Sequence, residues 1–147
     1  METPDVPADE ALRFKTTLRT RWVDEDNQSV LNNAIYLTLM EEGRHAYFSQ
    51  LGLMEGDRFP FVLAAANLRF VAPGRGGAQV ALAMSTVHLG ASSFEQVYRL
   101  SDAETGAVWC EARHRLVAWD NEARCKRPMT PEFRDKIAEF EGLTESA

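Results

Sequence analysis

The sequence lacks the features that would place it in a membrane or on a nucleic acid. Its longest apolar runs fall far short of the roughly 20 residues that a membrane-spanning helix needs. Its first residues have neither the basic start nor the apolar core of a secretory signal. With a net charge of −6 and no dense cluster of Lys and Arg, the chain also lacks the basic surface on which phosphate binding relies. These absences predict a cytoplasmic protein with no membrane partner and no nucleic-acid partner.

Cysteine and histidine are scarce. The chain has two cysteines, Cys110 and Cys125, and three scattered histidines, His45, His88 and His114. A structural zinc site needs four closely spaced ligands of these types, so we predict no metal site. Two cysteines suit a reducing compartment, where they act as small apolar residues.

What the sequence does contain is the material of one globular domain. Its 147 residues, of which 45% are hydrophobic, can bury roughly two-thirds of the unfolded surface, which is enough for a core. We therefore predict a single domain over residues 1–147, with residues 1–11 as a flexible tail. The sequence contains no internal repeat and no low-complexity segment.

The hydrophobic pattern predicts a strand, one long helix and then four more strands. Residues 12–22 alternate in the manner of a half-buried strand. After a polar turn, Asn32 or Asn33 can cap a helix that runs to about residue 51 and ends at Gly52. The later strands are predicted at residues 61–71, 78–89, 93–101 and 107–119, with PGRGG, GAS and DAETG as the turn segments between them.

The connections between these later strands are short, which predicts antiparallel hairpins because a parallel pair needs a longer crossover. PGRGG, in particular, is predicted to be a hairpin turn. A last, short helix is predicted from Thr130 as N-cap, Pro131 at the first helical position and Gly142 as its end. The fold class is therefore α+β, with an antiparallel five-stranded sheet wrapped around one long central helix and a short C-terminal helix.

The segment RWVDEDNQSVLNNAIYL, followed by MEEGR and LGL, resembles the opening of the hotdog-fold acyl-CoA thioesterases of the 4-hydroxybenzoyl-CoA thioesterase type. The resemblance extends from about residue 14 to about residue 137. It implies a hotdog fold, homodimers that share a continuous sheet and often pair into tetramers, and an active site at the dimer interface. It also implies that coenzyme A is part of the substrate and that no separate cofactor is needed.

The resemblance assigns the catalytic carboxylate to Asp26 and the amide that holds the thioester carbonyl to the backbone of Asn33. Thioester cleavage builds negative charge on the carbonyl oxygen, and backbone donors at a helix N-terminus stabilise such charge. A neighbouring carboxylate can act as a general base on water or as a nucleophile, and the sequence does not choose between the two roles. Asp26 could instead only cap its turn. Asp24 is expected to be structural, bound to the turn or to Arg21.

Two positions depart from the family pattern. Ser29 stands where the family usually has a glycine, a residue that tolerates positive φ and a close ligand. Val30 stands where a histidine is common. Both are predicted substrate-binding positions, as is Tyr36, which would suit a hydrophobic core equally well.

Three further groups of residues are candidates for the site. Glu41 is a reserve catalytic carboxylate, although a solvated position or an ion pair with Arg44 or His45 is the simpler interpretation. Ser92 and Ser93 resemble the family segment near the pantetheine and nucleotide arm, but their turn carries no charge. Three arginines would then have to bind the phosphates of coenzyme A, unless the substrate is an acyl-carrier protein. These arginines are Arg69, Arg75 and Arg99.

Other enzyme classes lack their residues. The chain has no G-x-S-x-G motif for a serine hydrolase, and PGRGG is too short for a phosphate-binding loop. None of the histidines stands in the acidic turn or at the helix start, where a hotdog dehydratase would need one. The leading hypothesis is an acyl-CoA or acyl-carrier-protein thioesterase, and the alternative is a non-catalytic hotdog protein that binds acyl-CoA or fatty acyl groups.

Overall fold

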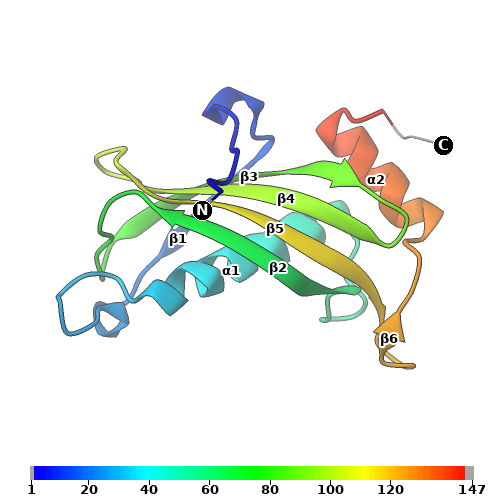
Figure 1. Ribbon diagram of the computed structural model, residues 1–147, viewed down its shortest axis with the longest axis horizontal. Helices are drawn as coiled ribbons and strands as arrows, with labels where there is room; N and C mark the ends of the chain where they lie inside the picture. The colour runs from blue at the N-terminus through cyan, green and yellow to red at the C-terminus, as the bar shows by residue number, and fades with distance from the viewer. Residues whose placement is uncertain (1, 145–147) are drawn as a thin grey trace.

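The computed structural model describes residues 2–144, which form one antiparallel sheet and two α-helices (Figure 1). Two short 3-10 helices, η1 (Asp9–Ala11) and η2 (Trp22–Asp24), flank the first strand. The strands are β1 (Phe14–Arg19), β2 (Phe61–Phe70), β3 (Gln79–Leu89), β4 (Ser93–Asp102), β5 (Val108–Asp120) and β6 (Cys125–Lys126), and the helices are α1 (Asn33–Leu51) and α2 (Pro131–Glu141).

The sheet has the strand order β1-β3-β4-β5-β2, and the short β6 pairs with the end of β5. All of its neighbouring strands are antiparallel. It curves around α1, whose buried side contributes Tyr36, Met40 and Tyr47 to the core. The predicted fold class is confirmed, with β6 as an additional strand.

The prediction that PGRGG is a hairpin turn is wrong. β2 pairs with β5 and β3 pairs with β4, so the segment from residue 71 to residue 78 joins strands that are not neighbours. It crosses the end of the sheet from the β2 edge, past the ends of β5 and β4. Eight residues can span this distance, since three strand spacings come to about 14 Å. A short connection therefore does not require a hairpin when both strands have nearer partners.

Both helices begin and end as predicted because their caps are local. The Asn32 side chain accepts a hydrogen bond from Ala34 N–H at 2.9 Å, and Gly52 ends α1 with a φ of 70°. In α2, Thr130 caps the first turn and Gly142 ends the helix with a φ of 69°. Only glycine adopts such positive φ values without strain, so each glycine fixes a helix end.

Residues 4–12, most of which were predicted to belong to a flexible tail, contact the face of the sheet opposite α1. Leu12 packs with Ala83 and Val97, and Val6 lies against the same small cluster. Arg99 of β4 donates a hydrogen bond to Asp9 at 2.6 Å. Figure 1 shows η1 and α1 on opposite sides of the sheet.

Candidate active site

The acidic turn before α1 is a small antiparallel hairpin. Asp26 N–H donates to Val30 O at 2.8 Å, and Asn32 N–H donates to Asp24 O at 2.9 Å. Ser29 N–H closes the turn on Asp26 O at 3.0 Å. This pairing folds the segment back on itself, so that Asp26 and the first residue of α1 lie at the same end of the molecule.

The first backbone amide of α1 is free. The Asn32 side chain caps Ala34, and Asn32 O accepts from Ile35 N–H at 2.9 Å. Within residues 2–144, no group accepts a hydrogen bond from Asn33 N–H. This N–H stands at the positive end of a 19-residue helix, which makes it a suitable donor for an oxygen that becomes negative.

Asp26 is partly exposed and keeps one carboxylate oxygen available. Its Oδ1 accepts from Gln28 N–H at 2.7 Å, which is the turn-capping contact expected of an aspartate in this position. Its Oδ2 receives no hydrogen bond from any part of the chain between residues 2 and 144. The carboxylate is thus oriented by its own turn and can still accept a proton or attack a carbon.

Ser29 adopts the left-handed backbone conformation, with a φ of 59°. This is the conformation for which a glycine was expected, so the chain keeps the shape of the turn without the glycine. Val30, the other departure, is partly buried beside it. Both residues lie next to Asp26.

Asp24 is a scaffold residue, as predicted. Arg21 donates to its Oδ1 through Nε at 3.1 Å and through Nη2 at 2.8 Å, and Arg21 N–H donates to Oδ2 at 2.8 Å. Hydrogen bonding to Arg21 holds the pKa of the buried Asp24 carboxyl below its usual value, against the opposing effect of burial. Asp24 therefore stays ionised and fixes the start of the hairpin.

The crossing segment clamps this hairpin from the other side. Gly74 O accepts from Leu31 N–H at 2.9 Å, and Gly76 N–H donates to the Glu25 carboxylate at 2.9 Å. Gly76 approaches so closely that an added Cβ would lie 2.5 Å from Arg21 O. Gly76 is needed for this approach, which sequence reasoning missed because the contact joins residues about fifty positions apart.

Tyr36 belongs to the same clamp. It is only 2% exposed, and its hydroxyl accepts a hydrogen bond from Gly74 N–H at 3.2 Å. Its ring lies 5.2 Å from that of Phe70. Burial raises the pKa of the Tyr36 hydroxyl, so the group stays protonated. In this chain Tyr36 joins the helix start to the crossing segment.

The structure separates other predicted residues from the acidic turn. Ser92 and Ser93 lie in the β3–β4 turn, at the opposite end of the sheet from the start of α1 (Figure 1). Glu41 is exposed and lines a hollow with Asp57 and Arg58. One chain therefore does not bring these three residues to Asp26.

The interpretation that Glu41 forms an ion pair with Arg44 is wrong. Arg44 points into the core, where it is 4% exposed and contacts Tyr98 and His114. At 100° per residue, position 44 falls on the flank of α1 that faces the sheet. The sequence signal that could have found this is helical spacing, since Arg44 stands four residues after the buried Met40.

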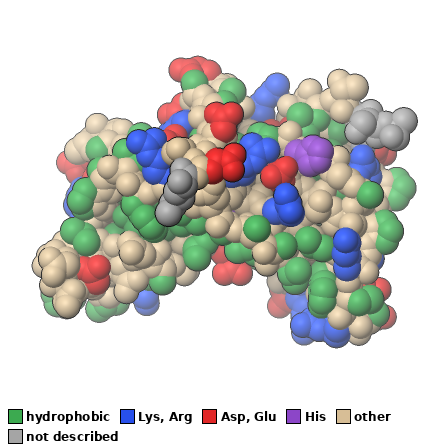
Figure 2. Space-filling model, viewed as in Figure 1, with side chains coloured by type: hydrophobic (Ala, Val, Ile, Leu, Met, Phe, Trp, Pro, Cys, Tyr) green, Lys and Arg blue, Asp and Glu red, His purple; other side chains and the backbone are tan. Residues whose placement is uncertain are grey.

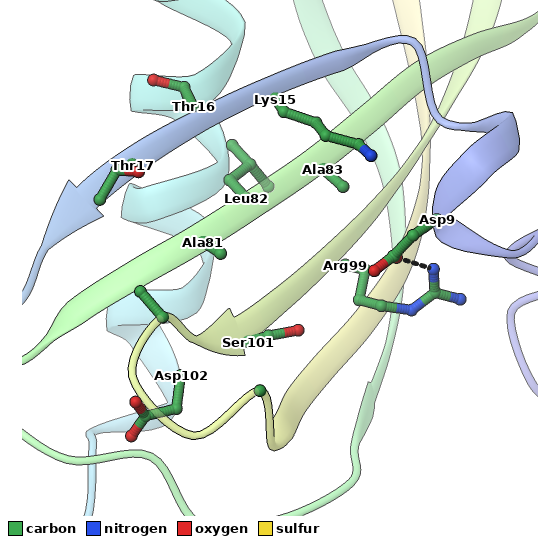
Figure 3. Close-up of a pocket in the computed structure, with 12 residues that line it drawn as sticks. Asp9, Lys15, Thr16, Thr17, Ala81, Leu82, Ala83, Arg99, Ser101 and Asp102 are labelled. Carbon is green, nitrogen blue, oxygen red and sulfur yellow. Dashed lines mark hydrogen bonds and ion pairs between the residues drawn. The ribbon is translucent and has the colours of Figure 1, made fainter.

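The three arginines predicted to bind phosphates already have acidic partners. Arg75 contacts Asp102 at 3.3 Å, and Arg69 lies 3.9 Å from Glu111. Arg99 contacts both Glu111 and Asp9, and Figure 3 shows the Asp9 contact beside a hollow of about 350 Å³ on the outer face of the sheet. Figure 2 shows acidic and basic side chains interspersed on the face of the molecule in view. This pairing weakens each arginine as a phosphate ligand.

Between residues 2 and 144, no group of three or more His, Cys, Asp or Glu side chains is arranged to hold a metal ion. No helix in that part of the chain is long and apolar enough to cross a membrane.

The chain is similar to known proteins in sequence and in fold. A family model described as Thioesterase-like superfamily matches residues 19–137. A thioesterase from Thermus thermophilus, complexed with coenzyme A and Zn, shares 27% identity over 92% of this chain and 99% of its own, with a TM-score of 0.79. A 1,4-dihydroxy-2-naphthoyl-CoA thioesterase from Synechocystis has the same fold, with 20% identity over 86% of this chain and 96% of its own and a TM-score of 0.75.

Proposed function

The chain belongs to the thioesterase-like superfamily, and from this premise we propose that it hydrolyses an acyl-CoA thioester to a free acid and a thiol. The observation that carries the proposal is the free Asn33 N–H at the start of α1, beside a turn that presents the Asp26 carboxylate. The carbonyl oxygen of a bound thioester would accept from this N–H, and the helix dipole would stabilise its developing charge.

Asp26 has two routes open to it. As a general base it removes a proton from water, the hydroxide adds to the carbonyl carbon, and the C–S bond breaks to release the thiolate. As a nucleophile its carboxylate adds to the carbonyl carbon and expels the thiolate, and water then hydrolyses the resulting anhydride. A single turnover in ¹⁸O water distinguishes the two, because only the nucleophilic route can leave ¹⁸O in the Asp26 carboxyl group.

The role of the backbone amide can be tested by changing Asn33 in two ways. Asn33→Pro removes the N–H but keeps the helix, because proline is well tolerated at the first helical position and Asn32 already has an extended ψ of 134°. We expect kcat to fall by about 10²- to 10³-fold, the usual effect of losing one oxyanion donor. Asn33→Ala keeps the N–H and should retain activity within about threefold. Equal activity of the two variants would exclude the amide from catalysis.

The activity itself is tested by thiol release from a panel of acyl-CoAs. Wild-type protein is expected to turn over, and Asp26→Asn to lose at least about 10³-fold, since the carboxylate is needed in either route. The absence of turnover on any chain length, together with no difference between wild type and Asp26→Asn, would show that the proposal is wrong.

A second candidate function is an acyl-ligand binding protein without catalysis. The hydrogen bond between Asp26 Oδ1 and Gln28 N–H favours it, because this contact is what a carboxylate that only caps its turn would make. Ser29 also favours this function, because it replaces the expected glycine beside Asp26 with a residue in a strained conformation. A thermal-shift screen with acyl-CoAs, run beside the turnover assay, separates the two functions: stabilisation without hydrolysis would indicate binding alone.

We propose coenzyme A rather than a carrier protein as the thiol. The coenzyme A complex of the Thermus relative supports this choice. Free coenzyme A should therefore inhibit competitively, and an acyl-carrier protein should not. We also propose a cytoplasmic location, in which the two free thiols would stay reduced.

We further propose a homodimer formed through the β2 edges. Among residues 2–144, β2 has a partner strand on one side only, and it carries exposed apolar side chains that a soluble edge strand normally avoids. Val62, Leu63 and Phe70 are 38%, 41% and 49% exposed. A two-fold axis would pair the edges antiparallel and bring the β3–β4 side of one copy toward the acidic turn of the other. The separated candidates Glu41, Ser92 and Ser93 would then approach the partner's site.

A further inference from the structure

Arg44 is a buried cation. Its side chain is 4% exposed, and its Nη1 donates to the Tyr98 hydroxyl at 3.2 Å and to His114 Nδ1 at 3.0 Å. Within residues 2–144, no carboxylate forms an ion pair with it. An uncompensated charge in a core costs free energy, so a buried arginine normally has an anion beside it.

His114 contacts one side of the Arg44 guanidinium. A guanidinium can only donate, so His114 Nδ1 must accept, and the imidazole is the neutral form with its proton on Nε2. Burial, together with the Arg44 charge, lowers the pKa of His114 to about 3, which keeps it neutral. Arg44 Nε and His114 Nε2 are both buried and have no hydrogen-bond partner in the described part of the chain. Because Arg44 Nη1 contacts His114 Nδ1, the Nε2–H of His114 points away from Arg44, and each orphan donor calls for an acceptor of its own.

This pair lies beside a strip of the sheet that is exposed, formed by Ala66 and Phe70 of β2. His114 of β5 is paired directly with Ala66 of β2, so the two side chains share the face toward α1. Ala66 is nevertheless exposed, and Phe70, further along the same face, is 49% exposed while its ring contacts Tyr36. The strip thus leads from Arg44 and His114 along β2 to the first turn of α1, where Asn33 and Asp26 lie.

We propose that Arg44 binds a carboxylate at the far end of the acyl group, so that the preferred substrates are coenzyme A monothioesters of dicarboxylic acids. This inference rests on the proposed thioesterase function. A carboxylate supplies what Arg44 lacks, since it neutralises the guanidinium and accepts a hydrogen bond from the orphan Nε–H. A hydrocarbon end would leave the charge and this donor unsatisfied.

The position of Arg44 also sets the length of the acyl group. Arg44 follows Asn33 by eleven residues, which corresponds to about 16 Å along the helix axis, and its side chain leans back toward the helix start. An acyl chain of roughly eight to ten carbons spans the remaining distance between the Asn33 amide and the guanidinium. Suberyl-CoA and sebacyl-CoA are therefore the substrates to test.

The test compares these two with octanoyl-CoA and decanoyl-CoA, which have the same length and lack the carboxylate. For wild-type protein we expect kcat/KM to be at least about 10-fold higher for the dicarboxylic substrates. Arg44→Met should lower kcat/KM for them by about 100-fold or more and reverse the preference. This large effect is expected because a buried site built to bind a polar group strongly rejects a mismatch. Arg58→Met, which removes an exposed arginine, is the matched control and should leave the preference unchanged.

Binding of the free acids gives a second measurement that needs no variant. Suberate and sebacate should raise the melting temperature of wild-type protein more than octanoate and decanoate do. If wild type hydrolyses the monocarboxylic substrates equally well or better, or the free diacids give no extra stabilisation, the inference is overturned while the thioesterase activity stands. If none of the four thioesters is hydrolysed, the proposed function itself fails.

Discussion

Ser29 holds a backbone conformation that costs an L-amino acid free energy. Its φ of 59° places its Cβ close to neighbouring backbone atoms, which glycine avoids. We predict that Ser29→Gly raises the free energy of unfolding by about 0.5–1 kcal/mol, as the relief of strain exceeds the entropy that glycine adds to the unfolded chain. Urea denaturation measures this. Asn27→Gly, in the same turn but without positive φ, should be neutral or destabilising, and stabilisation of both variants alike would contradict the explanation.

Single residues also show which contacts can be predicted from the sequence and which cannot. Asp24 could be assigned to Arg21 from the sequence because the two are three positions apart and meet in a local turn. Helical spacing from Met40 indicates the buried side of α1 for Arg44, but the sequence could not identify its partners, because Tyr98 and His114 lie on two strands more than fifty residues away. Polar side chains on a helix are normally solvated, so the contacts of a buried one are known only when the opposite surface is known.

At the scale of elements, α2 is held by a buried carboxylate. Glu141 accepts from the Tyr47 hydroxyl at 2.6 Å and from Thr86 N–H at 2.7 Å, and burial raises its pKa above the ordinary value. The folded protein therefore retains this proton to higher pH than the unfolded chain does. The stability from Glu141 is fully present below its unfolded pKa and is lost as the pH rises through the folded pKa.

Glu141→Gln should remove this pH dependence. A glutamine amide oxygen can accept the same two hydrogen bonds and does not ionise. We predict that the unfolding free energy of wild type minus that of Glu141→Gln decreases from pH 5 to pH 8, by about 1.4 kcal/mol for each unit by which the pKa is raised. Denaturation curves at several pH values test this, with the exposed Glu139→Gln as control. A difference that stays constant with pH would refute the assignment.

The crossing segment between β2 and β3 is the element that positions the acidic turn. Gly76→Ala would place a Cβ 2.5 Å from Arg21 O, so the two segments must move apart. We predict a loss of about 1–3 kcal/mol in stability and at least a tenfold loss of kcat/KM. Gly77→Ala is the control, because its Cβ meets nothing within 4 Å although its φ is 66°. It should cost about 1 kcal/mol through backbone strain and leave kcat/KM unchanged, and equal kinetic losses would contradict the clamp.

Elements also divide into those the sequence could predict and those it could not. The long helix and α2 were predictable because caps and glycine ends are set by neighbouring residues, from Asn32 to Gly52 and from Thr130 to Gly142. The path of PGRGG was not, because strand order depends on which distant strands pair. The family resemblance gave the fold class without giving the contacts of that segment.

At the scale of the whole molecule, the candidate residues are divided between its two ends. Asp26, Asn33 and Ser29 lie where α1 begins, and Ser92 and Ser93 lie at the other end of the sheet. The sequence alone could place all of them near one ligand only through the resemblance, which implies a site shared by two chains. The proposed antiparallel pairing of two β2 edges would bring the two ends together.

A charged β2 edge should prevent the proposed pairing of two copies. Val62→Lys combined with Leu63→Lys places two charges on the exposed edge, where they would repel a second copy. We predict a shift from dimer to monomer in light scattering after size-exclusion chromatography, and a loss of kcat/KM of about 100-fold or more because each site loses its partner. Thr17→Lys adds a charge to exposed β1 at the opposite edge and should leave both properties unchanged. A double variant that stays dimeric would show that β2 is not the interface, and a fully active monomer would show that one chain holds the complete site.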